Sequence, residues 1–463
     1  MFAWTLVAIA VFAALGLQAP PVPVIEPDSA SYLDNSAFRR LGYPAFLDVL
    51  QSLDATLRQI MWAQIALYAA ATAALGRVLW DQAAPWLAVV MMASLALNPF
   101  LIEYQFAIMS ESIWLSAALV WLAFLSVLYL RSPSFRSILW FGLITGLLIV
   151  IRPASLPFLP LAIAAVVVIP AALRMRVRLG FGLAAGLLAT ALVGAERLAH
   201  QHRHDGVENS QTAAVLFARA LLLPAVVLPE GAAYPALERR VAGDLRPVLQ
   251  AIEATADYRV RLYLLAQYGI LGHFSYRPPE LDRAATRTGE SREDVMAAFA
   301  LRRIGEQPLA FLAHGAEQFV GLWTILPINT PSGATAYAEF LQVNSPLPFA
   351  TELPALTVAE LPYRWFFPYL QVALWLGGLI LLGHLLWAAA ALAMRRSLGA
   401  DMWLALTLNL TVQASFAGIA IVNIAVERFT VVHMPLIALA LLLIARTVVV
   451  GPWRSVSRSL CDS

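Results

Sequence analysis

The amino-acid sequence predicts an all-α polytopic membrane protein with about ten or eleven transmembrane helices. Of its 463 residues, 60% are hydrophobic and only 13% are charged, whereas soluble globular proteins carry about 25% charged residues. The apolar residues come in runs of roughly twenty, the length that a helix needs to cross a bilayer core about 30 Å thick. This composition excludes a water-soluble fold. The membrane-spanning segments are expected to be helical, because a helix satisfies its own backbone hydrogen bonds in lipid.

The run at 308–327 differs from the other apolar runs because it contains His314 and Glu317 and follows a polar helix. We therefore expect an interfacial or re-entrant helix there, and about ten spans in all. The other runs lie near residues 2–18, 57–80, 84–101, 110–130, 136–151, 155–173, 178–195, 366–393, 402–424 and 430–450.

Arginines in short connections indicate the orientation, because such connections are usually cytoplasmic. They occur at 131–136, 174–178, 395–396 and 454–458. Both termini are then expected in the cytoplasm. The opposite, outer side receives the first loop at 19–56, the connections at 98–109 and 151–155, and the long segment 196–365.

Three regions follow from this topology. Residues 1–195 form a first transmembrane module with the outer loop, 196–365 a mostly helical periplasmic segment, and 366–463 a second module with a cytoplasmic tail. In the middle region, Ser291 followed by Asp294 predicts a capping box at the start of a helix. An amphipathic helix is expected at 231–256 and irregular chain at 329–362.

The first outer loop carries several acids, two arginines and two tyrosines just above the expected membrane surface, where a lipid headgroup lies. One interpretation is a solvated loop with an aspartate at a helix N-terminus, and the other is a binding site. The residues concerned are Asp28, Tyr32, Arg39, Arg40 and Tyr43.

The next outer connection is also acidic, with Glu103 and the pair Ser110-Glu111. Ser110 is interpreted as the cap of the following helix. Glu111 is then favourable at the positive N-terminal end of that helix.

Two arginines lie at outer helix ends, against the distribution expected for cations. Arg152 requires an anion, either a carboxylate from the first loop or a lipid phosphate, and its planar guanidinium suits both. Arg428 follows Glu427, which either neutralises it or acts with it at a site. Charged groups at this depth are costly, so they are paired or functional.

Five short motifs occur in a fixed order along the chain. They are Asp28-Ser-x-x-Tyr32, Arg39-x-x-Gly-Tyr43-Pro, Ser110-Glu111, Arg152-Pro and Glu427-Arg428-Phe. In this order and placement the sequence resembles the GT-C superfamily of membrane glycosyltransferases, especially the branch with protein O-mannosyltransferases and the lipid A aminoarabinose transferase. The resemblance covers residues 1 to about 200 and 402–450.

The resemblance implies an enzyme of the bacterial inner membrane whose active site faces the periplasm. Such enzymes transfer a sugar with inversion from a polyprenyl-phosphate donor to a hydroxyl of an envelope lipid, glycan or protein. Asp28 is the expected base, which takes the acceptor proton. The expected phosphate ligands are Arg152, Arg428, Arg39 and Arg40. Glu103, Glu111, Glu427, Tyr32 and Tyr43 would line the sugar and acceptor cavity, where Glu103 or Glu111 would hold the sugar or orient an arginine.

No cofactor is required by this chemistry. Oxygen ligands from Asp28 and Glu103 offer a place for a divalent metal, to which we do not commit. The histidines His200, His202 and His204 are a weaker metal candidate next to a span. Nucleic acid is excluded as a partner because the net charge is only +2 and no basic stripe is present.

Other classes of function share some of these features. A transporter or flippase of polyprenyl-linked sugars would need similar arginines but places polar groups near the bilayer midplane. A glycan polymerase or ligase would carry its key arginines in the large outer segment. A noncatalytic assembly subunit is the remaining alternative. The clustering of acids and arginines at the outer ends of the expected spans favours the transferase.

Overall fold

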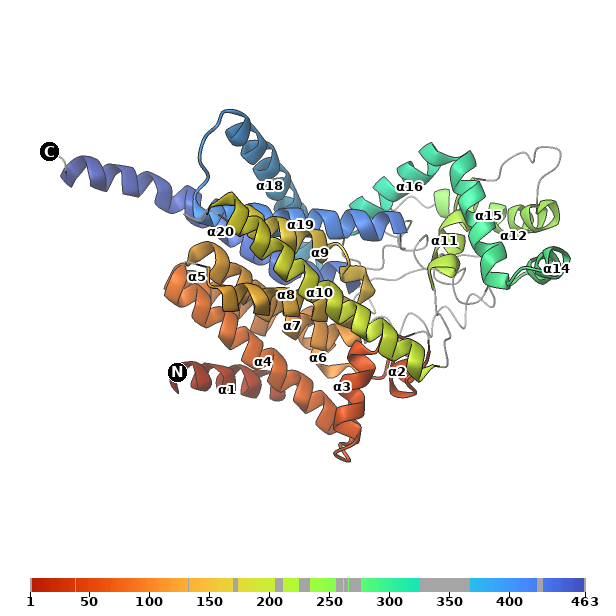
Figure 1. Ribbon diagram of the computed structural model, residues 1–463, viewed down its shortest axis with the longest axis horizontal. Helices are drawn as coiled ribbons and strands as arrows, with labels where there is room; N and C mark the ends of the chain where they lie inside the picture. The colour runs from red at the N-terminus through yellow and green to blue at the C-terminus, as the bar shows by residue number, and fades with distance from the viewer. Residues whose placement is uncertain are drawn as a thin grey trace. The chain divides into compact units, whose positions relative to one another are not determined.

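The computed structural model describes the main chain of residues 2–37, 39–131, 133–169, 174–204, 211–224, 234–254, 261, 265, 276–324, 367–422 and 428–461. The chain is an α-helical polytopic membrane protein (Figure 1). The expected irregular stretch at 329–362 and Glu427 lie outside the described residues. Arg428 begins a helix, but its side chain also lies outside them.

The chain forms two compact units, which are described separately. The first consists of Met1–Val207, Trp375–Ser415 and Val431–Ser463, and the second of Glu208–Leu374 and Phe416–Thr430. The helices that lie wholly in the first unit are α1 (Phe2–Gly16), α2 (Pro27–Leu33), α3 (Gly42–Gln51), α4 (Leu57–Gln82), α5 (Pro85–Leu97), α6 (Pro99–Phe106), α7 (Ser110–Leu130), α8 (Phe135–Ile151), the 3-10 turn η1 (Pro153–Ser155), α9 (Phe158–Val167) and α10 (Met175–Arg203).

The second unit contains α11 (Gln211–Leu221), α12 (Pro235–Glu253), α14 (Pro279–Thr288), α15 (Arg292–Glu306) and α16 (Pro308–Gly321). Its core packs Phe217 of α11 against Phe299 of α15, with their ring centroids 5.4 Å apart. Three further helices contribute residues to both units: α18 (Phe367–Ala393), α19 (Ala400–Val422) and α20 (Arg428–Cys461).

Five of the described helices are long and apolar enough to cross a membrane, or six if a bent pair is one span. The five are in α7, α10, α18, α19 and α20. Shorter apolar helices cover Phe2–Gly16, Phe135–Ile151 and Pro153–Val167. The class predicted from the sequence is therefore confirmed, whereas the expected number of about ten spans stays a prediction.

The apolar run expected near 84–101 is not one straight helix. The structure divides it into α5 and α6, which are bent by 55° at Asn98. The cause is local, because Pro99 cannot continue the hydrogen-bond ladder of the preceding helix. Asn98 instead starts a new helix, and its side-chain oxygen accepts the backbone N–H of Phe100 at 3.0 Å.

Two expected helices of the middle region are present. The predicted capping box is confirmed, since Ser291 Oγ accepts the backbone N–H of Asp294 at 3.1 Å at the start of α15. The helix expected at 231–256 is α12. With 14 residues, α16 is about 21 Å long at 1.5 Å per residue, too short to cross the bilayer core by itself.

Small residues bring α8 and α10 into close contact in the first unit. Gly142 and Gly146, four positions apart on α8, lie against Ala185 and Ala189 of α10. A Cβ added at Gly142 would come 2.6 Å from the carbonyl oxygen of Ala185, so the two backbones almost touch. Small residues at this spacing are a common way for membrane helices to pack. In Figure 1, α10 runs along α8, which is followed by α7 and then α4.

We predict that Gly142→Ala lowers the free energy of unfolding by about 1–3 kcal/mol, because the added methyl group overpacks a backbone contact. Gly180→Ala is the matched control, since nothing lies within 4 Å of the added Cβ on α10. The control should gain up to about 1 kcal/mol from better helix propensity. Thermal unfolding of both variants in detergent measures the difference, and equal shifts would contradict the prediction.

Candidate functional site

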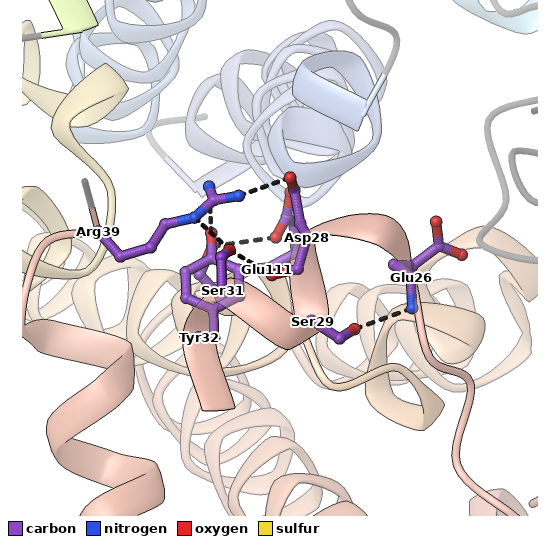
Figure 2. A network of polar contacts seen from close by, with 8 residues as sticks. Glu26, Asp28, Ser29, Ser31, Tyr32, Arg39 and Glu111 are labelled. Atoms are coloured by element: carbon purple, nitrogen blue, oxygen red, sulfur yellow. Dashed lines mark hydrogen bonds and ion pairs between the residues drawn. The ribbon is translucent and has the colours of Figure 1, made fainter. Parts of the chain in front are cut away.

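The first loop, at residues 19–56, folds back on itself over a short helix. Pro27 begins α2, and Ser29 Oγ accepts the backbone N–H of Glu26 at 2.8 Å. After α2, Asn35 adopts a left-handed backbone conformation with φ 47°. Asparagine tolerates this conformation better than most residues, so it suits the reversal. The reversal brings Arg39 back over α2 (Figure 2).

The loop is anchored to the helices at both ends. Val24 exchanges backbone hydrogen bonds with the chain before α7, donating to Phe106 O at 2.9 Å and accepting from Ile108 N at 3.1 Å. At the other end, Gly42 lies against the end of α8, where an added Cβ would be 2.7 Å from Val150 O. Only glycine permits this approach without a shift of backbone.

Arg39 is the centre of the polar contacts in the loop. Its Nη2 contacts Asp28 Oδ1 at 2.5 Å, and its Nε donates to Ser31 Oγ at 2.7 Å. Nη1 donates to the hydroxyl of Tyr32 at 3.3 Å, and the guanidinium lies 4.4 Å from the centre of that ring. Figure 2 shows the arginine reaching across α2 to these groups. The guanidinium is thereby held in one orientation.

The contacts continue from Tyr32 to the start of α7. The Tyr32 hydroxyl lies 3.0 Å from Ser110 Oγ, which donates to Glu111 Oε2 at 3.0 Å. The other carboxylate oxygen of Glu111 lies 3.1 Å from Arg152 Nη1 at the end of α8. We call the chain of residues Asp28, Arg39, Tyr32, Ser110, Glu111 and Arg152 the outer network.

The two ends of the outer network differ in exposure. The side chains of Asp28 and Arg39 are 22% and 14% exposed, whereas those of Glu111 and Arg152 are 1% and 9% exposed. A ligand therefore reaches the Asp28 end more easily. Burial raises the pKa of the Tyr32 phenol, and nearby Glu111 adds to the shift. The phenol is consequently neutral at pH 7 and links the two charged ends by hydrogen bonds.

Tyr43 packs against Tyr32 of the network and connects it to α4. Its ring meets that of Tyr32 edge to face at 5.1 Å, and its hydroxyl donates to Gln64 Oε1 on α4 at 2.7 Å. Gln64 Nε2 donates in turn to the carbonyls of Gln105 and Ala107, at 3.2 Å and 2.9 Å. Burial raises the pKa of Tyr43 well above its usual value, so this phenol is also neutral. The set fixes the position of Tyr32 relative to α4.

Glu196 on α10 holds the second half of the loop. Its Oε1 accepts the backbone N–H of Leu41 at 3.0 Å, and its Oε2 lies 3.3 Å from Arg40 Nη1. Farther along α10, Arg203 contacts Asp48 of α3 at 2.6 Å. The end of α10 therefore determines where α3 begins.

Of the residues predicted to form the site, the structure brings together Asp28, Tyr32, Arg39, Glu111 and Arg152, with Tyr43 beside them. Glu111 lies next to Arg152, because α7 begins beside the end of α8. Glu111 thus contacts an arginine, whereas its expected role in orienting that arginine for a donor stays a prediction. Arg40 pairs with Glu196, and Glu103 lies half-buried on α6. The expected roles of Glu427 and Arg428 stay predictions, because their side chains are outside the described residues.

The interpretation of Ser110 as a helix cap is wrong. Met109 occupies the N-cap position of α7, and Ser110 is the first helical residue. The hydroxyl of Ser110 instead bridges Tyr32 and Glu111. Three positioning residues escaped the sequence analysis, namely Ser31, Gln64 and Glu196. The last two are polar side chains on largely apolar helices, which is the signal that marks them.

Among the residues that the structure describes, no group of three or more His, Cys, Asp or Glu side chains is arranged to hold a metal ion. Comparison with protein-family models, with curated proteins and with solved structures gives no match. What the outer network does is therefore inferred from its own residues and geometry.

We predict that Glu111→Gln and Arg152→Gln each lower the free energy of unfolding by about 3–5 kcal/mol, because each leaves a buried charge without its ion-pair partner. The double variant should lose less than the sum of the two, since it leaves neither charge behind. Thermal unfolding in detergent of all four proteins tests this coupling. Strict additivity would show that the pair at 3.1 Å contributes no coupling.

We also predict that Glu196→Ala lowers the free energy of unfolding by about 1–3 kcal/mol, because the Leu41 N–H loses its acceptor. Glu196→Gln keeps an acceptor oxygen and loses only the attraction to Arg40, whose side chain is 42% exposed. Its loss should stay below about 1 kcal/mol. Equal losses for the two variants would mean that the charge, and not the hydrogen bond, holds the loop.

Proposed function

We propose that the protein is an inverting glycosyltransferase that moves a sugar from a polyprenyl-phosphate donor to a hydroxyl acceptor. The observation that carries this proposal is the Asp28–Arg39 pair, a partly exposed carboxylate and guanidinium that end a network of buried groups. A base for a hydroxyl and a cation for a phosphate are the two parts that such a transfer needs. The ordered sequence motifs, which resemble those of the GT-C superfamily, support the same assignment.

In the proposed reaction, the acceptor oxygen forms a bond to the anomeric carbon while the bond from that carbon to the phosphate oxygen breaks. Asp28 takes the proton of the acceptor hydroxyl. The leaving group becomes a polyprenyl phosphate monoester and gains negative charge. Arg39 stabilises this charge, since a preorganised cation acts where charge develops.

The pairing of Asp28 with Arg39 suggests how donor binding is coupled to catalysis. In the structure the carboxylate and the guanidinium neutralise each other at 2.5 Å. A phosphate offers the guanidinium a bidentate partner of higher charge, so it competes with Asp28 for Arg39. The donor would thereby release the carboxylate to act as a base.

The setting of the reaction is also part of the proposal. We propose that the first loop lies on the periplasmic side of a bacterial inner membrane, which the distribution of arginines in the short connections supports. A lipid, a glycan or a protein of the cell envelope would supply the hydroxyl. No cofactor enters the scheme.

A transporter of polyprenyl-linked sugars is the second candidate, because α5 and α6 form a helix pair bent by 55°. Broken helices are common in transporters, where they line a substrate site. Arg39 and Arg152 would then bind the phosphate of the donor, and the protein would move the donor without transferring its sugar. Turnover distinguishes the two functions.

We predict that Asp28→Asn lowers the rate of sugar transfer by about 10²- to 10⁴-fold. Donor binding should stay equal or become tighter. The substitution removes the proton acceptor and also the carboxylate that competes for Arg39. Purified protein in detergent would receive radiolabelled polyprenyl-phosphate sugars and host membrane acceptors. Asp34→Asn is the matched control, since Asp34 is an exposed aspartate just after α2.

Arg39→Gln should weaken donor binding in the same assay, whereas Arg58→Gln, an exposed arginine at the start of α4, should not. Equal transfer by Asp28→Asn and wild type would remove Asp28 from the role of base. Donor binding without turnover in wild type, together with donor movement across reconstituted vesicles, would favour the transporter.

A further inference from the structure

The second unit contains a cavity of about 790 Å³. Its volume is in the range of small-molecule and lipid sites, about 300–1,000 Å³. Apolar side chains of α11, α12 and α16 form much of the wall, including Leu221, Leu245, Leu249 and Ala310. None of the residues that line it belongs to the outer network.

Arg303 and His314 in the wall each have a buried nitrogen atom without a hydrogen-bond partner among the described residues. Arg303 is 1% exposed, and its Nη1 pairs with Glu238 at 2.6 Å, yet its Nε has no partner. His314 on α16 has an unpartnered Nδ1. Buried polar atoms of folded proteins nearly always find a partner, so such atoms in a cavity wall indicate a ligand.

A further arginine, Arg219, lies behind this wall and next to α16. Arg219 of α11 is fully buried beneath α16, with its guanidinium 5.5 Å from the centre of the Phe311 ring. Nη2 donates to the carbonyl of Ala420 at 2.7 Å, but Nε and Nη1 have no partner among the described residues. No carboxylate of the described part of the chain pairs with it.

The charged side chains that line the cavity are Arg246, Arg261 and Arg303 and the acids Glu253 and Glu317, and Arg303 also pairs with Glu238. These three arginines are balanced by three acids, so Arg219 behind the wall leaves a positive surplus. Arg303 is matched by Glu238, and Arg261 by Glu317 at 3.3 Å, whereas Arg219 has no acidic partner in the described chain. Burial and the nearby Arg219 lower the pKa of His314 to about 3, so the imidazole is neutral and adds hydrogen-bonding capacity without charge. An isolated buried cation is expensive, and an anion at the wall would offset it.

The outer face of α16 indicates where the ligand comes from. Leu309, Leu312 and Val320 share one face of this helix and are 80%, 56% and 48% exposed. The residues Ala310, His314 and Glu317 of the same helix line the cavity. A helix with an exposed apolar face suits the surface of a bilayer, so lipid is the ligand close at hand.

We propose that this cavity binds a membrane lipid with a net-anionic phosphate headgroup, whose chain occupies the apolar part and whose phosphate is bound at the wall formed by Arg303 and His314. Arg219 acts behind the wall through its uncompensated charge. This inference does not rest on the proposed sugar transfer, because it uses none of the residues of the outer network.

The test measures thermal unfolding of the full-length protein in detergent, and lipid retained by native mass spectrometry. Dioleoyl phosphatidic acid is the probe, with phosphatidylcholine and inorganic phosphate as comparisons. Phosphatidic acid should raise the unfolding temperature of the wild type, whereas phosphatidylcholine and inorganic phosphate should not. Arg219→Met should weaken that binding about tenfold or more, the loss expected for an interaction with a charged group.

Arg219→Met should also unfold at a higher temperature than wild type without lipid, since it removes an uncompensated buried charge. A variant that merely fails to fold cannot give this result. Arg239→Met is the control, an exposed arginine of α12 that does not line the cavity. Ala242→Trp fills the cavity and should abolish binding, whereas Ala236→Trp, on the exposed face of α12, should not.

Equal binding of phosphatidic acid by wild type, Arg219→Met and Ala242→Trp would overturn the proposal. A full shift with phosphatidylcholine would show that the headgroup charge plays no part, which also overturns it. A full shift with inorganic phosphate alone would replace the lipid by a free anion and would overturn the lipid assignment.

Discussion

The arrangement of the first loop, the start of α7 and the end of α8 depends on the contact between Glu111 and Arg152. The two charged groups are almost fully buried, where an isolated charge is costly and an opposite charge offsets that cost. Their contact at 3.1 Å joins the start of α7 to the end of α8. The negative charge of Glu111 is favourable at the positive N-terminal end of α7, and the positive charge of Arg152 is favourable at the negative C-terminal end of α8. Ser110 and Tyr32 then connect the first loop to this pair.

The helices of the first unit could largely be predicted from hydropathy, because a run of apolar residues must form a helix in lipid. The runs at 110–130 and 136–151 correspond closely to α7 and α8. The bend between α5 and α6 was missed, although Asn98-Pro99 is a local signal for it. A hydropathy window averages over the bend and cannot see it. The chain reversal at Asn35 and the anchoring of Val24 depend on tertiary contacts and were equally inaccessible.

The candidate site was predictable in its members and not in its pairing. Asp28, Arg39, Glu111 and Arg152 stand out because charged residues are rare in this chain and these lie at helix ends. Which carboxylate meets which arginine depends on how the loop folds back. Adjacent residues illustrate the limit: Arg39 turns to Asp28, whereas Arg40 turns to Glu196 on α10. Sequence spacing alone cannot separate two neighbours that point apart.

Arginines with and without an acidic partner occur in the described part of the chain, and the difference between them bears on function. Arg152 and Arg39 each contact a carboxylate, so the structure needs no further anion at those positions. A phosphate bound there would have to exchange partners with an acid, which links binding to the release of a base. Arg219 has no acidic partner in the described chain, so an anion near it would add a partner without displacing one. A site of exchange suits a substrate that must leave, whereas a site of simple addition suits a ligand that stays.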